Sequence, residues 1–308
     1  MSRASKHIFG AVLTAMLTPF NEKMEVDYDA AANLAKHLVE HGNDGLVIAG
    51  TTGESPTLTH DEKLKLFKVV KEAVGSKASV VAGTGNNSTA ESIKFTQEAE
   101  ALGVDGALVV CPYYNKPPQE GLYRHFEMIA SKTKLPIMIY NVPGRTSVNM
   151  LPETMARLAD IPNIVGVKES AGSVEQAAEI ARRTQGKSFA IWSGDDAVTL
   201  PFLSVGGIGV VSVAGHLVGK EISQMIKLFF EGKVVEATAI HLRLMELFKT
   251  LFITTNPIPL KAAMQLAGFK VGGLRPPLVW AGEKEVQAVR EAMRPLRLLA
   301  GEEIRQSV

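Results

Sequence analysis

Eight short apolar segments recur along this chain, and each is followed by a stretch with the hydrophobic period of a helix. The apolar segments are continuous rather than alternating, which is typical of strands buried on both faces of a sheet. They cover residues 11–16, 45–49, 79–83, 107–111, 137–140, 164–168, 190–193 and 208–213. Eight strand–helix units predict an α/β fold of the closed (β/α)8 type, the TIM barrel. An open, doubly wound sheet has the same local patterns, but the first turn lacks a glycine fingerprint, which favours the barrel.

Helix start and stop signals bound the segments between the predicted strands. Gly42, Gly75 and Gly103 follow the first three of these segments. We expect helices over residues 29–41, 61–74, 89–102, 120–131, 152–160, 174–183 and 196–204, with an eighth beginning near Leu217. Three further helical segments follow at 234–252, 258–267 and 283–299. We therefore predict a barrel over residues 1–232 and a C-terminal helical region over residues 233–308 that packs on it.

The composition argues against several classes of function. The net charge of +1 gives no electrostatic footprint for nucleic acid or for an anionic membrane surface. No apolar stretch reaches the ~20 residues that a membrane-spanning helix needs. Cys111 is the only cysteine, so the chain cannot form an internal disulfide, and we expect a reducing, cytoplasmic environment.

The N-terminus carries two features of a secretory signal. Arg3 and Lys6 precede the apolar residues 8–17, which together give a basic head and an apolar middle. However, a Thr-Pro-Phe sequence follows at residues 18–20 in place of a small-x-small cleavage site. We therefore interpret the apolar residues as the first strand of the barrel, which cleavage would remove.

Polar residues cluster where five of the predicted strands end. Barrel enzymes place their chemistry on the loops at these carboxyl ends. The polar positions are residues 50–55 after the second strand, 112–117 after the fourth, 141–146 after the fifth, Lys168 at the end of the sixth and 194–196 after the seventh. The sequence therefore predicts one candidate site, at one face of the barrel.

Lys168 is the member of this set that most strongly indicates chemistry. It closes the apolar run 164–167, and an ammonium at the end of a buried strand is costly unless it is paired or used. Removal from water favours the neutral amine, which attacks carbonyl carbons to form a Schiff base. The alternative is a lysine that extends its charged head into solvent at the strand end. Both interpretations stay open on this residue alone.

Two of the loops carry groups that suit a carboxylate ligand. Thr51 and Thr52 lie in a glycine-flanked turn, which presents backbone N–H groups and hydroxyls to an anion. Such threonines can equally satisfy their own backbone. Arg145 lies in an otherwise apolar loop, where a guanidinium can bind a carboxylate through two hydrogen bonds. The alternative for Arg145 is a surface salt bridge.

Tyr113, Tyr114 and Tyr140, which are three of the five tyrosines, also fall at predicted strand ends. Phenols next to a Schiff base can relay protons between lysine, substrate and water. Most tyrosines instead pack and make a single hydrogen bond. Their shared location favours the functional interpretation.

Two motif matches do not fit this site. Residues 37–41 match the H-x-x-E-H zinc-protease pattern, but they end the first predicted helix, away from the candidate face. Residues 206–209 are rich in glycine but lead into a strand rather than a helix, unlike a dinucleotide fingerprint. We find no convincing set of metal ligands and no Ser-His-Asp arrangement, and we expect neither a metal nor an organic cofactor.

Seven short motifs occur in an order that is similar to one enzyme family. They are Gly-Thr-Thr-Gly-Glu-Ser at 50–55, Tyr-Tyr-Asn at 113–115, Tyr-Asn-Val-Pro-Gly-Arg-Thr at 140–146, Gly-Val-Lys-Glu at 166–169, Ser-Gly-Asp-Asp at 193–196, Asn-Pro-Ile-Pro-Leu-Lys at 256–261 and Leu-Arg-Pro-Pro-Leu at 274–278. By these motifs, nearly the whole chain resembles the dihydrodipicolinate synthase (4-hydroxy-tetrahydrodipicolinate synthase) family of pyruvate-dependent class I aldolases.

The resemblance implies a reaction and a set of roles. Pyruvate would condense with L-aspartate 4-semialdehyde, the first committed step toward diaminopimelate and lysine, in a homotetramer of two tight dimers. Lys168 would form the Schiff base with pyruvate. Thr52, Tyr140 and Tyr114 would form the proton relay, and the phenol of Tyr114 would reach a neighbouring subunit's site. The substrate ligands implied are Thr51 and Thr52 for the pyruvate carboxylate, Arg145 for the semialdehyde carboxylate, and the backbone carbonyls of Gly194 and Val211.

The resemblance also implies a site for feedback inhibition. In many relatives, lysine inhibits by binding at the tight-dimer interface. Lys63 departs from the pattern, since strongly inhibited relatives carry His or Glu there, and an added cation would repel a lysine ligand. We therefore expect weak or absent lysine inhibition. The other matching positions are Ser55, His60, Asn87, Glu91 and Tyr113.

Two other functions stay open. A sister aldolase that cleaves a longer 2-keto acid, such as a sialic acid or keto-deoxy-sugar lyase, would share the barrel, the lysine and one tyrosine. Arg145 together with the motif at 113–115 favours the synthase over that aldolase. The fold alone is also compatible with a catalytically silent barrel that binds a keto acid or only assembles with partners. The complete catalytic set favours an enzyme.

Overall fold

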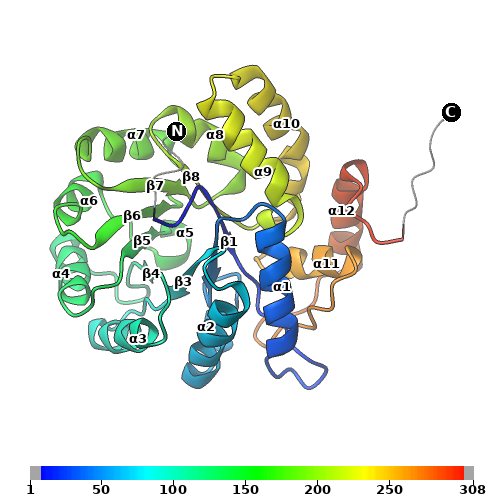
Figure 1. The fold of residues 1–308 in the computed structure, drawn as a ribbon, viewed down its shortest axis with the longest axis horizontal. Coiled ribbons are helices and arrows are strands. Elements are labelled where there is room, and N and C mark those ends of the chain that lie inside the picture. Colours follow the sequence, from blue (N-terminus) through cyan, green and yellow to red (C-terminus); the bar gives the residue numbers. More distant parts are fainter. Residues whose placement is uncertain (1–7, 302–308) are drawn as a thin grey trace.

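The computed structural model describes residues 8–301, and in it eight parallel strands close into a barrel with helices around it (Figure 1). The strand order follows the sequence, and β1 pairs with both β2 and β8. This closure confirms the predicted barrel over the open sheet. The strands are β1 (Val12–Ala15), β2 (Gly45–Ile48), β3 (Ser79–Gly83), β4 (Gly106–Val110), β5 (Ile137–Asn141), β6 (Ile164–Glu169), β7 (Ala190–Ser193) and β8 (Gly209–Ser212).

Every helix expected from the sequence is present. The helices are α1 (Tyr28–Glu40), α2 (His60–Val74), α3 (Thr89–Ala101), α4 (Gln119–Ala130), α5 (Pro143–Thr146), α6 (Pro152–Leu158), α7 (Val174–Arg183), α8 (Thr199–Ser204), α9 (Gly215–Phe230), α10 (Val234–Thr250), α11 (Ile258–Leu266) and α12 (Glu283–Met293). The short helix α5 was not predicted. The expected helix over 283–299 was too long, because Pro295 disfavours continuation and the chain makes a 3₁₀ turn over Arg294–Leu296.

Local sequence sets the ends of the first helices. The carboxylate of Asp27 accepts a hydrogen bond from the backbone N–H of Ala30 at 2.9 Å, which caps α1. Thr59 and Glu62 form a reciprocal capping box at the start of α2. Gly75 ends α2 with a positive φ of 59°, a conformation that costs glycine little. These signals depend on near neighbours in the sequence, and the stop at Gly75 was among those predicted from it.

Alternate residues of the strands build two apolar layers. The residues that face the barrel interior are Phe9, Leu13, Ala15, Val47, Val81, Leu108, Met138, Tyr140, Val142, Ala190, Trp192, Ile208 and Val211. The opposite faces pack under the helices in a larger cluster. All of β1 is buried, which confirms the interpretation of the N-terminal apolar residues as a barrel strand. Arg3 and Lys6 lie outside the described residues.

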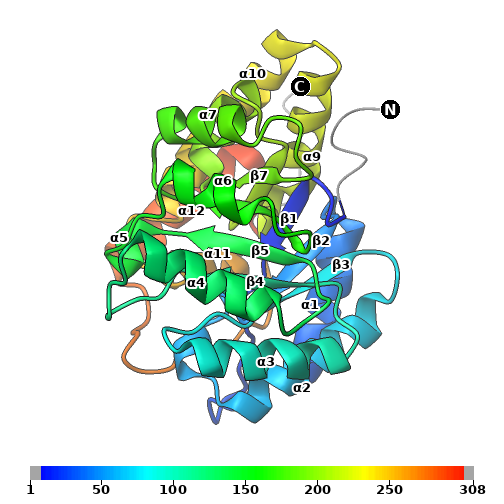
Figure 2. The same cartoon turned by 90° about the vertical axis from the view of Figure 1, so that its left-hand side faces the viewer.

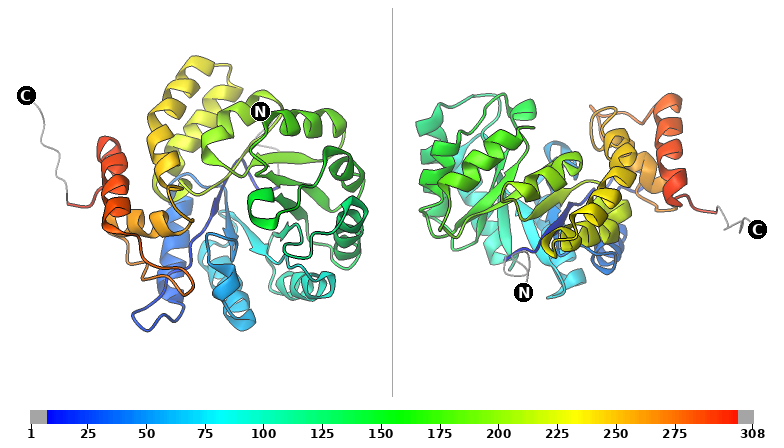
Figure 3. Two further views of the ribbon diagram at one scale, coloured as in Figure 1. Left: turned by 180° about the vertical axis from the view of Figure 1, so that it is seen from behind. Right: turned by 90° about the horizontal axis from the view of Figure 1, so that it is seen from above.

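The C-terminal helices lie to one side of the barrel (Figures 2 and 3). Helix α10 packs along α9, and α11 packs against α12. The predicted division after residue 232 falls between α9 and α10 and stays a prediction. Within residues 8–301, no helix has both the length and the apolar character that a bilayer span requires.

We expect acid to destabilise the fold through His216 at the start of α9. This imidazole is 2% exposed; its Nε2 accepts the Leu17 N–H at 3.0 Å, so its Nδ1–H donates to the Val213 carbonyl at 2.8 Å. Burial lowers the pKa of His216 to about 4, from 6.5. The pKa of His216 is lower in the folded state than in the unfolded state. The contribution of the neutral imidazole to the free energy of unfolding is therefore fully present above pH 6.5 and is lost as the pH falls toward 4.

Chemical denaturation at pH 7 and pH 4.5 measures the effect. The wild type should lose about 2 kcal/mol of unfolding free energy through this residue over that interval. In His216→Gln this loss of unfolding free energy between pH 7 and pH 4.5 should be absent. In His60→Gln, which alters an exposed histidine, the loss should be the same as in the wild type. An unchanged pH dependence in His216→Gln would contradict the prediction.

Candidate active site

Lys168 lies in the penultimate position of β6 and points into the barrel. Its strand neighbours in register are Tyr140 on β5 and Trp192 on β7, both of which belong to the interior layer. The residue is only 6% exposed, and its Nζ lies 4.2 Å from the centroid of the Tyr140 ring. Among residues 8–301, no carboxylate forms an ion pair with this ammonium. A lysine that reached for solvent would not be buried in this way, so the geometry favours use of the amine.

Glu169, the next residue, faces the other way and does not neutralise Lys168. Its carboxylate accepts the side-chain amide of Asn141 at 3.1 Å and the backbone N–H of Ala171 at 2.7 Å. Burial raises the pKa of Glu169 to about 7, against those hydrogen bonds. No role was predicted for Glu169 from the sequence. Strand alternation places it between the barrel and α7, where it joins β5 to β6.

Gly194 packs directly against the lysine. Its backbone N–H donates to the carbonyl of Glu169 at 2.8 Å, which fixes the start of the loop after β7. A Cβ at this position would lie 3.1 Å from Lys168 Cε and 1.8 Å from Ser170 Oγ. The position therefore has room only for glycine. The expected role of Gly194, to line the site through its backbone carbonyl, stays a prediction.

A pocket of about 340 Å³ opens beside this lysine at the carboxyl ends of β2 to β5. Tyr140 joins the two, because its ring contacts Lys168 and also lines the pocket. Lys63 and Arg145 supply positive charge to the lining, which among the described residues contains no carboxylate. Such a pocket attracts anions. The other polar or aromatic lining residues are Thr51, Ser55, Asn86, Tyr113 and Thr146.

The two threonines of the turn after β2 occupy different environments. Thr51 lines the pocket. Thr52 is 2% exposed, and its Oγ1 accepts a hydrogen bond from the side chain of Asn256 at 2.8 Å. Asn256, which comes just before α11, begins the motif at 256–261, and no role was predicted for it from the sequence. A contact across 204 residues leaves no local signal that the sequence could have offered.

The loop after β4 places its two tyrosines differently. Tyr113 lines the pocket and is 38% exposed. Tyr114 is 90% exposed, has a positive φ of 72° and does not join Lys168 within the described chain. Its expected contribution to a neighbouring subunit stays a prediction. Val211 is fully buried and fills the barrel interior with its side chain, in register with Leu13 on the adjacent strand β1.

The positions expected to bind an effector only partly converge. Ser55, Lys63 and Tyr113 line the pocket. Burial lowers the pKa of Lys63, whose Nζ lies 5.7 Å from the centroid of the Phe95 ring. The remaining three lie outside the pocket lining: His60 pairs with Glu98 at 2.6 Å, Asn87 accepts a hydrogen bond from Asn115, and Glu91 is exposed in the first turn of α3.

The H-x-x-E-H match forms part of the surface of α1. His37 and His41 stack with ring centroids 3.9 Å apart at the end of that helix. Across residues 8–301, no group of three His, Cys, Asp or Glu side chains is arranged to hold a metal ion. The motif therefore contributes no ligand set.

Comparison with known proteins agrees with this geometry. The profile of the Dihydrodipicolinate synthetase family matches residues 8–295. A 4-hydroxy-tetrahydrodipicolinate synthase from Cyanothece sp. (strain PCC 7425 / ATCC 29141) is 58% identical over 292 residues, which cover 94% of this chain and 99% of that protein. One from Heliobacterium modesticaldum is 57% identical, over 92% of this chain and 94% of that one.

Solved structures also match nearly the whole chain. The enzyme from Cyanidioschyzon merolae, crystallised with lysine bound, superposes with a TM-score of 0.94 at 52% identity and covers 96% of this chain and 100% of that one. The enzyme from Thermotoga maritima gives a TM-score of 0.93 at 44% identity, over 95% and 100% of the two chains. With a buried lysine at the end of β6, an anion-attracting pocket beside it and these relatives along nearly its whole length, the chain belongs to the dihydrodipicolinate synthetase family.

Proposed function

We propose that this enzyme condenses pyruvate with L-aspartate 4-semialdehyde to give 4-hydroxy-tetrahydrodipicolinate, using Lys168 as the nucleophile. The observation that carries the assignment is a buried lysine without a carboxylate partner among the described residues, in contact with Tyr140. Its neutral amine attacks the ketone carbon of pyruvate, and water leaves. The resulting protonated imine withdraws electrons, so a methyl proton is lost and an enamine forms.

The enamine carbon then attacks the aldehyde carbon of the second substrate and forms the new carbon–carbon bond. The amine of that substrate attacks the imine carbon, which closes the ring and releases Lys168. These steps need proton transfers near the lysine, and the phenol ring of Tyr140, whose centroid lies 4.2 Å from Lys168 Nζ, is suited to relay them. No step requires a metal or an organic cofactor.

The pocket and the turn beside it support roles for three further residues. Arg145 at the rim offers a two-point site for the semialdehyde carboxylate. The turn that contains Thr51 and Thr52 offers N–H groups and hydroxyls to the pyruvate carboxylate. The resemblance gave the relay hydroxyl to Thr52, but Thr52 is buried against Asn256, so we place it at the pocket-lining Thr51.

Pyruvate consumption by the purified protein, with and without L-aspartate 4-semialdehyde, tests the proposal. Rapid consumption only when both substrates are present is the expected result. Cleavage of a sialic acid or keto-deoxy-sugar acid to release pyruvate would instead establish the sister aldolase. If neither reaction occurs, borohydride trapping of pyruvate on Lys168 separates an aldolase of another specificity from a silent barrel.

We further propose a cytoplasmic homotetramer built from two tight dimers. The support is the almost complete exposure of the Tyr114 ring, a large aromatic side chain that lacks cover in the single chain. Cys111, the only thiol, is free and buried, which suits a reducing compartment. Sedimentation of the purified protein at several concentrations measures the assembly, and a monomer at all of them would contradict it.

We expect L-lysine to be a weak inhibitor because of Lys63. This cation lines the pocket beside Ser55 and Tyr113, and no carboxylate of residues 8–301 lines the pocket to offset a second ammonium. The affinity for L-lysine should rise about tenfold in Lys63→Gln, since a like charge at short range is removed. Lys65→Gln, which alters an exposed lysine on the same helix, is the matched control. Half-inhibition of the wild type at sub-millimolar lysine would overturn the prediction.

A further inference from the structure

The turn after β2, residues 50–55, is entered at Ala49 and left at Glu54 through backbone conformations that these two residue types disfavour. Ala49 and Glu54 have φ values of 54° and 55°, in the left-handed region that favours glycine. Such residues keep this conformation only where their surroundings hold it. Two backbone hydrogen bonds close the turn itself, from Glu54 N–H to Thr51 O and from Ser55 N–H to Gly50 O. Additional support has to come from outside the turn.

That support comes from the segment around α11, more than 200 residues later in the sequence. The side-chain amide of Asn256 donates to Thr52 Oγ1 at 2.8 Å. The Nζ of Lys261 lies 2.6 Å from Glu54 Oε1, and the backbone N–H of Arg275 donates to Glu54 Oε2 at 3.0 Å. Both carboxylate oxygens of Glu54 are therefore held by the C-terminal region.

The ion pair between Lys261 and Glu54 is almost completely enclosed. Their side chains are 0% and 1% exposed, respectively. Desolvation lowers the pKa of Lys261 to about 8, although the Glu54 carboxylate acts in the opposite direction. A buried ion pair stabilises a fold poorly compared with apolar side chains of the same volume. Its position directly beside the Thr51–Thr52 turn points to a role in geometry rather than in stability.

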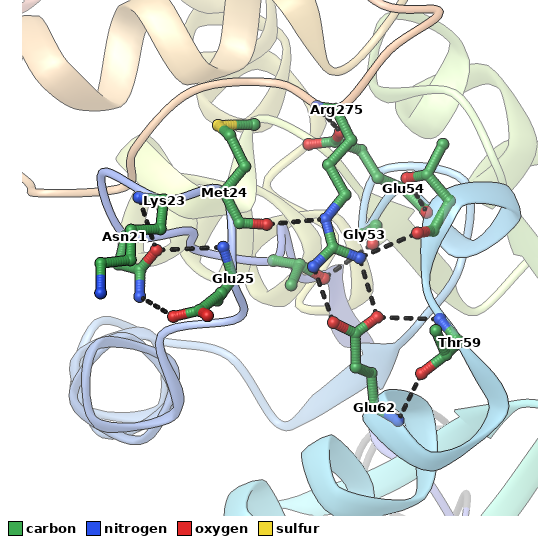
Figure 4. A network of polar contacts seen from close by, with 11 residues as sticks. Asn21, Lys23, Met24, Glu25, Gly53, Glu54, Thr59, Glu62 and Arg275 are labelled. Atoms are coloured by element: carbon green, nitrogen blue, oxygen red, sulfur yellow. Dashed lines mark hydrogen bonds and ion pairs between the residues drawn. The ribbon is translucent and has the colours of Figure 1, made fainter.

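Arg275 extends the same connection to the helix that follows the turn. Figure 4 shows its guanidinium between Met24, Glu54 and Glu62. It donates to both carboxylate oxygens of Glu62 at 2.7 and 2.8 Å and to the Met24 carbonyl at 2.9 Å. Glu62 in turn completes the capping box of α2 with Thr59. The turn is thus fixed at its centre by Asn256 and beyond its end by Arg275.

We propose that Asn256 and Lys261 are positioning residues for the reaction: they hold the turn so that Thr51 and Thr52 meet the carboxylate of pyruvate. Neither side chain needs to touch substrate. Asn256 fixes Thr52 through its hydroxyl, and Lys261 neutralises the carboxylate that anchors Glu54 in its left-handed conformation. The inference rests on the proposed function and makes the C-terminal region a part of the site that binds pyruvate.

Steady-state kinetics of Asn256→Ala and Lys261→Met in the full-length enzyme test the proposal. We expect the KM for pyruvate to rise at least about tenfold in each variant, with the KM for the semialdehyde within about twofold of wild type. Arg145→Ala should show the opposite split, because it removes the ligand proposed for the semialdehyde. Asn256→Ala leaves no buried charge unpaired, so it keeps the test available if Lys261→Met fails to fold.

Rescue and a matched control separate positioning from stability. In Glu54→Gln/Lys261→Met the pair is neutral and of similar volume, so the KM for pyruvate should return to within about threefold of wild type. His241→Gln alters a buried residue of α10 away from the turn and should lower the thermal unfolding midpoint without changing either KM. Unchanged KM values in Asn256→Ala and Lys261→Met, or equal rises for both substrates, would overturn the proposal. A wild type that does not condense the substrates refutes the proposed function instead.

Discussion

Replacing Lys168 by alanine is expected to abolish turnover while the barrel stays folded. The substitution removes the amine that forms the Schiff base, and loss of a covalent nucleophile typically lowers kcat by at least about 10³-fold. The fold should persist, because Lys168 makes no ion pair within residues 8–301 and its removal leaves no buried charge without a partner. Initial rates with both substrates, together with circular dichroism, measure the two effects.

Lys168→Met and Lys65→Ala are the controls for this prediction. Methionine keeps the buried volume next to the Tyr140 ring, so a loss of activity in both Lys168 variants cannot be attributed to a cavity. Lys65 is exposed on α2, and its replacement should leave the rate unchanged. Borohydride with pyruvate should label the wild type and Lys65→Ala and neither Lys168 variant. Near-normal activity in Lys168→Ala would refute the assignment.

Gly194→Ala is expected to lower kcat/KM by about 10²-fold, since a displacement of about 1 Å at a reacting group has an effect of this size. The added methyl group would lie 1.8 Å from Ser170 Oγ and 3.1 Å from Lys168 Cε. Because these distances are too short, Ser170, Lys168 or the loop itself has to shift, and a shift of Lys168 would displace the reacting amine. The loss should appear in the yield of the trapped pyruvate adduct as well as in turnover.

A second substitution identifies which contact matters. Gly194→Ala/Ser170→Ala removes the closer of the two clashes and should recover part of the activity. Gly282→Ala is the matched control, because its methyl group would meet only Glu285 Oε2, at an ordinary 3.6 Å. Full activity in Gly194→Ala would contradict the prediction. It would show that the loop after β7 accommodates the methyl group without displacing Lys168.

The sequence predicted the barrel and the position of Lys168 because both depend on local patterns. Continuous apolar runs with glycine and capping signals between them specify strand–helix units, and a closed parallel sheet orders those units along the chain. The loops after the strands then meet at one face, so Arg145 and Tyr140 could be placed together from their spacing alone. The β6 strand extends one residue further than expected, to Glu169.

The sequence could not predict the contacts that fix these loops. Thr51 and Thr52 look equivalent in the sequence, and only the contact with Asn256 separates a pocket-lining threonine from a buried one. In the sequence, Lys261 is a single charged residue in a mostly apolar helix, and no local pattern indicates that it pairs with Glu54. Pairings across 200 residues are set by how the barrel and its appended helices pack, which no local period encodes.

The anchoring of the β2 turn by residues after position 255 has a consequence for how the enzyme is made. At about 5–20 residues per second, the ribosome delivers Asn256 some 10–40 s after Thr52. During that time the strands β1 to β8 can emerge and close, but the turn lacks its partners. A nascent or prematurely terminated chain would therefore carry Lys168 in a barrel without a well-formed pyruvate site. The chain would therefore become active only after the C-terminal helices have been synthesised and have packed against the barrel. The appended region would thus limit activity to chains whose synthesis has passed these helices.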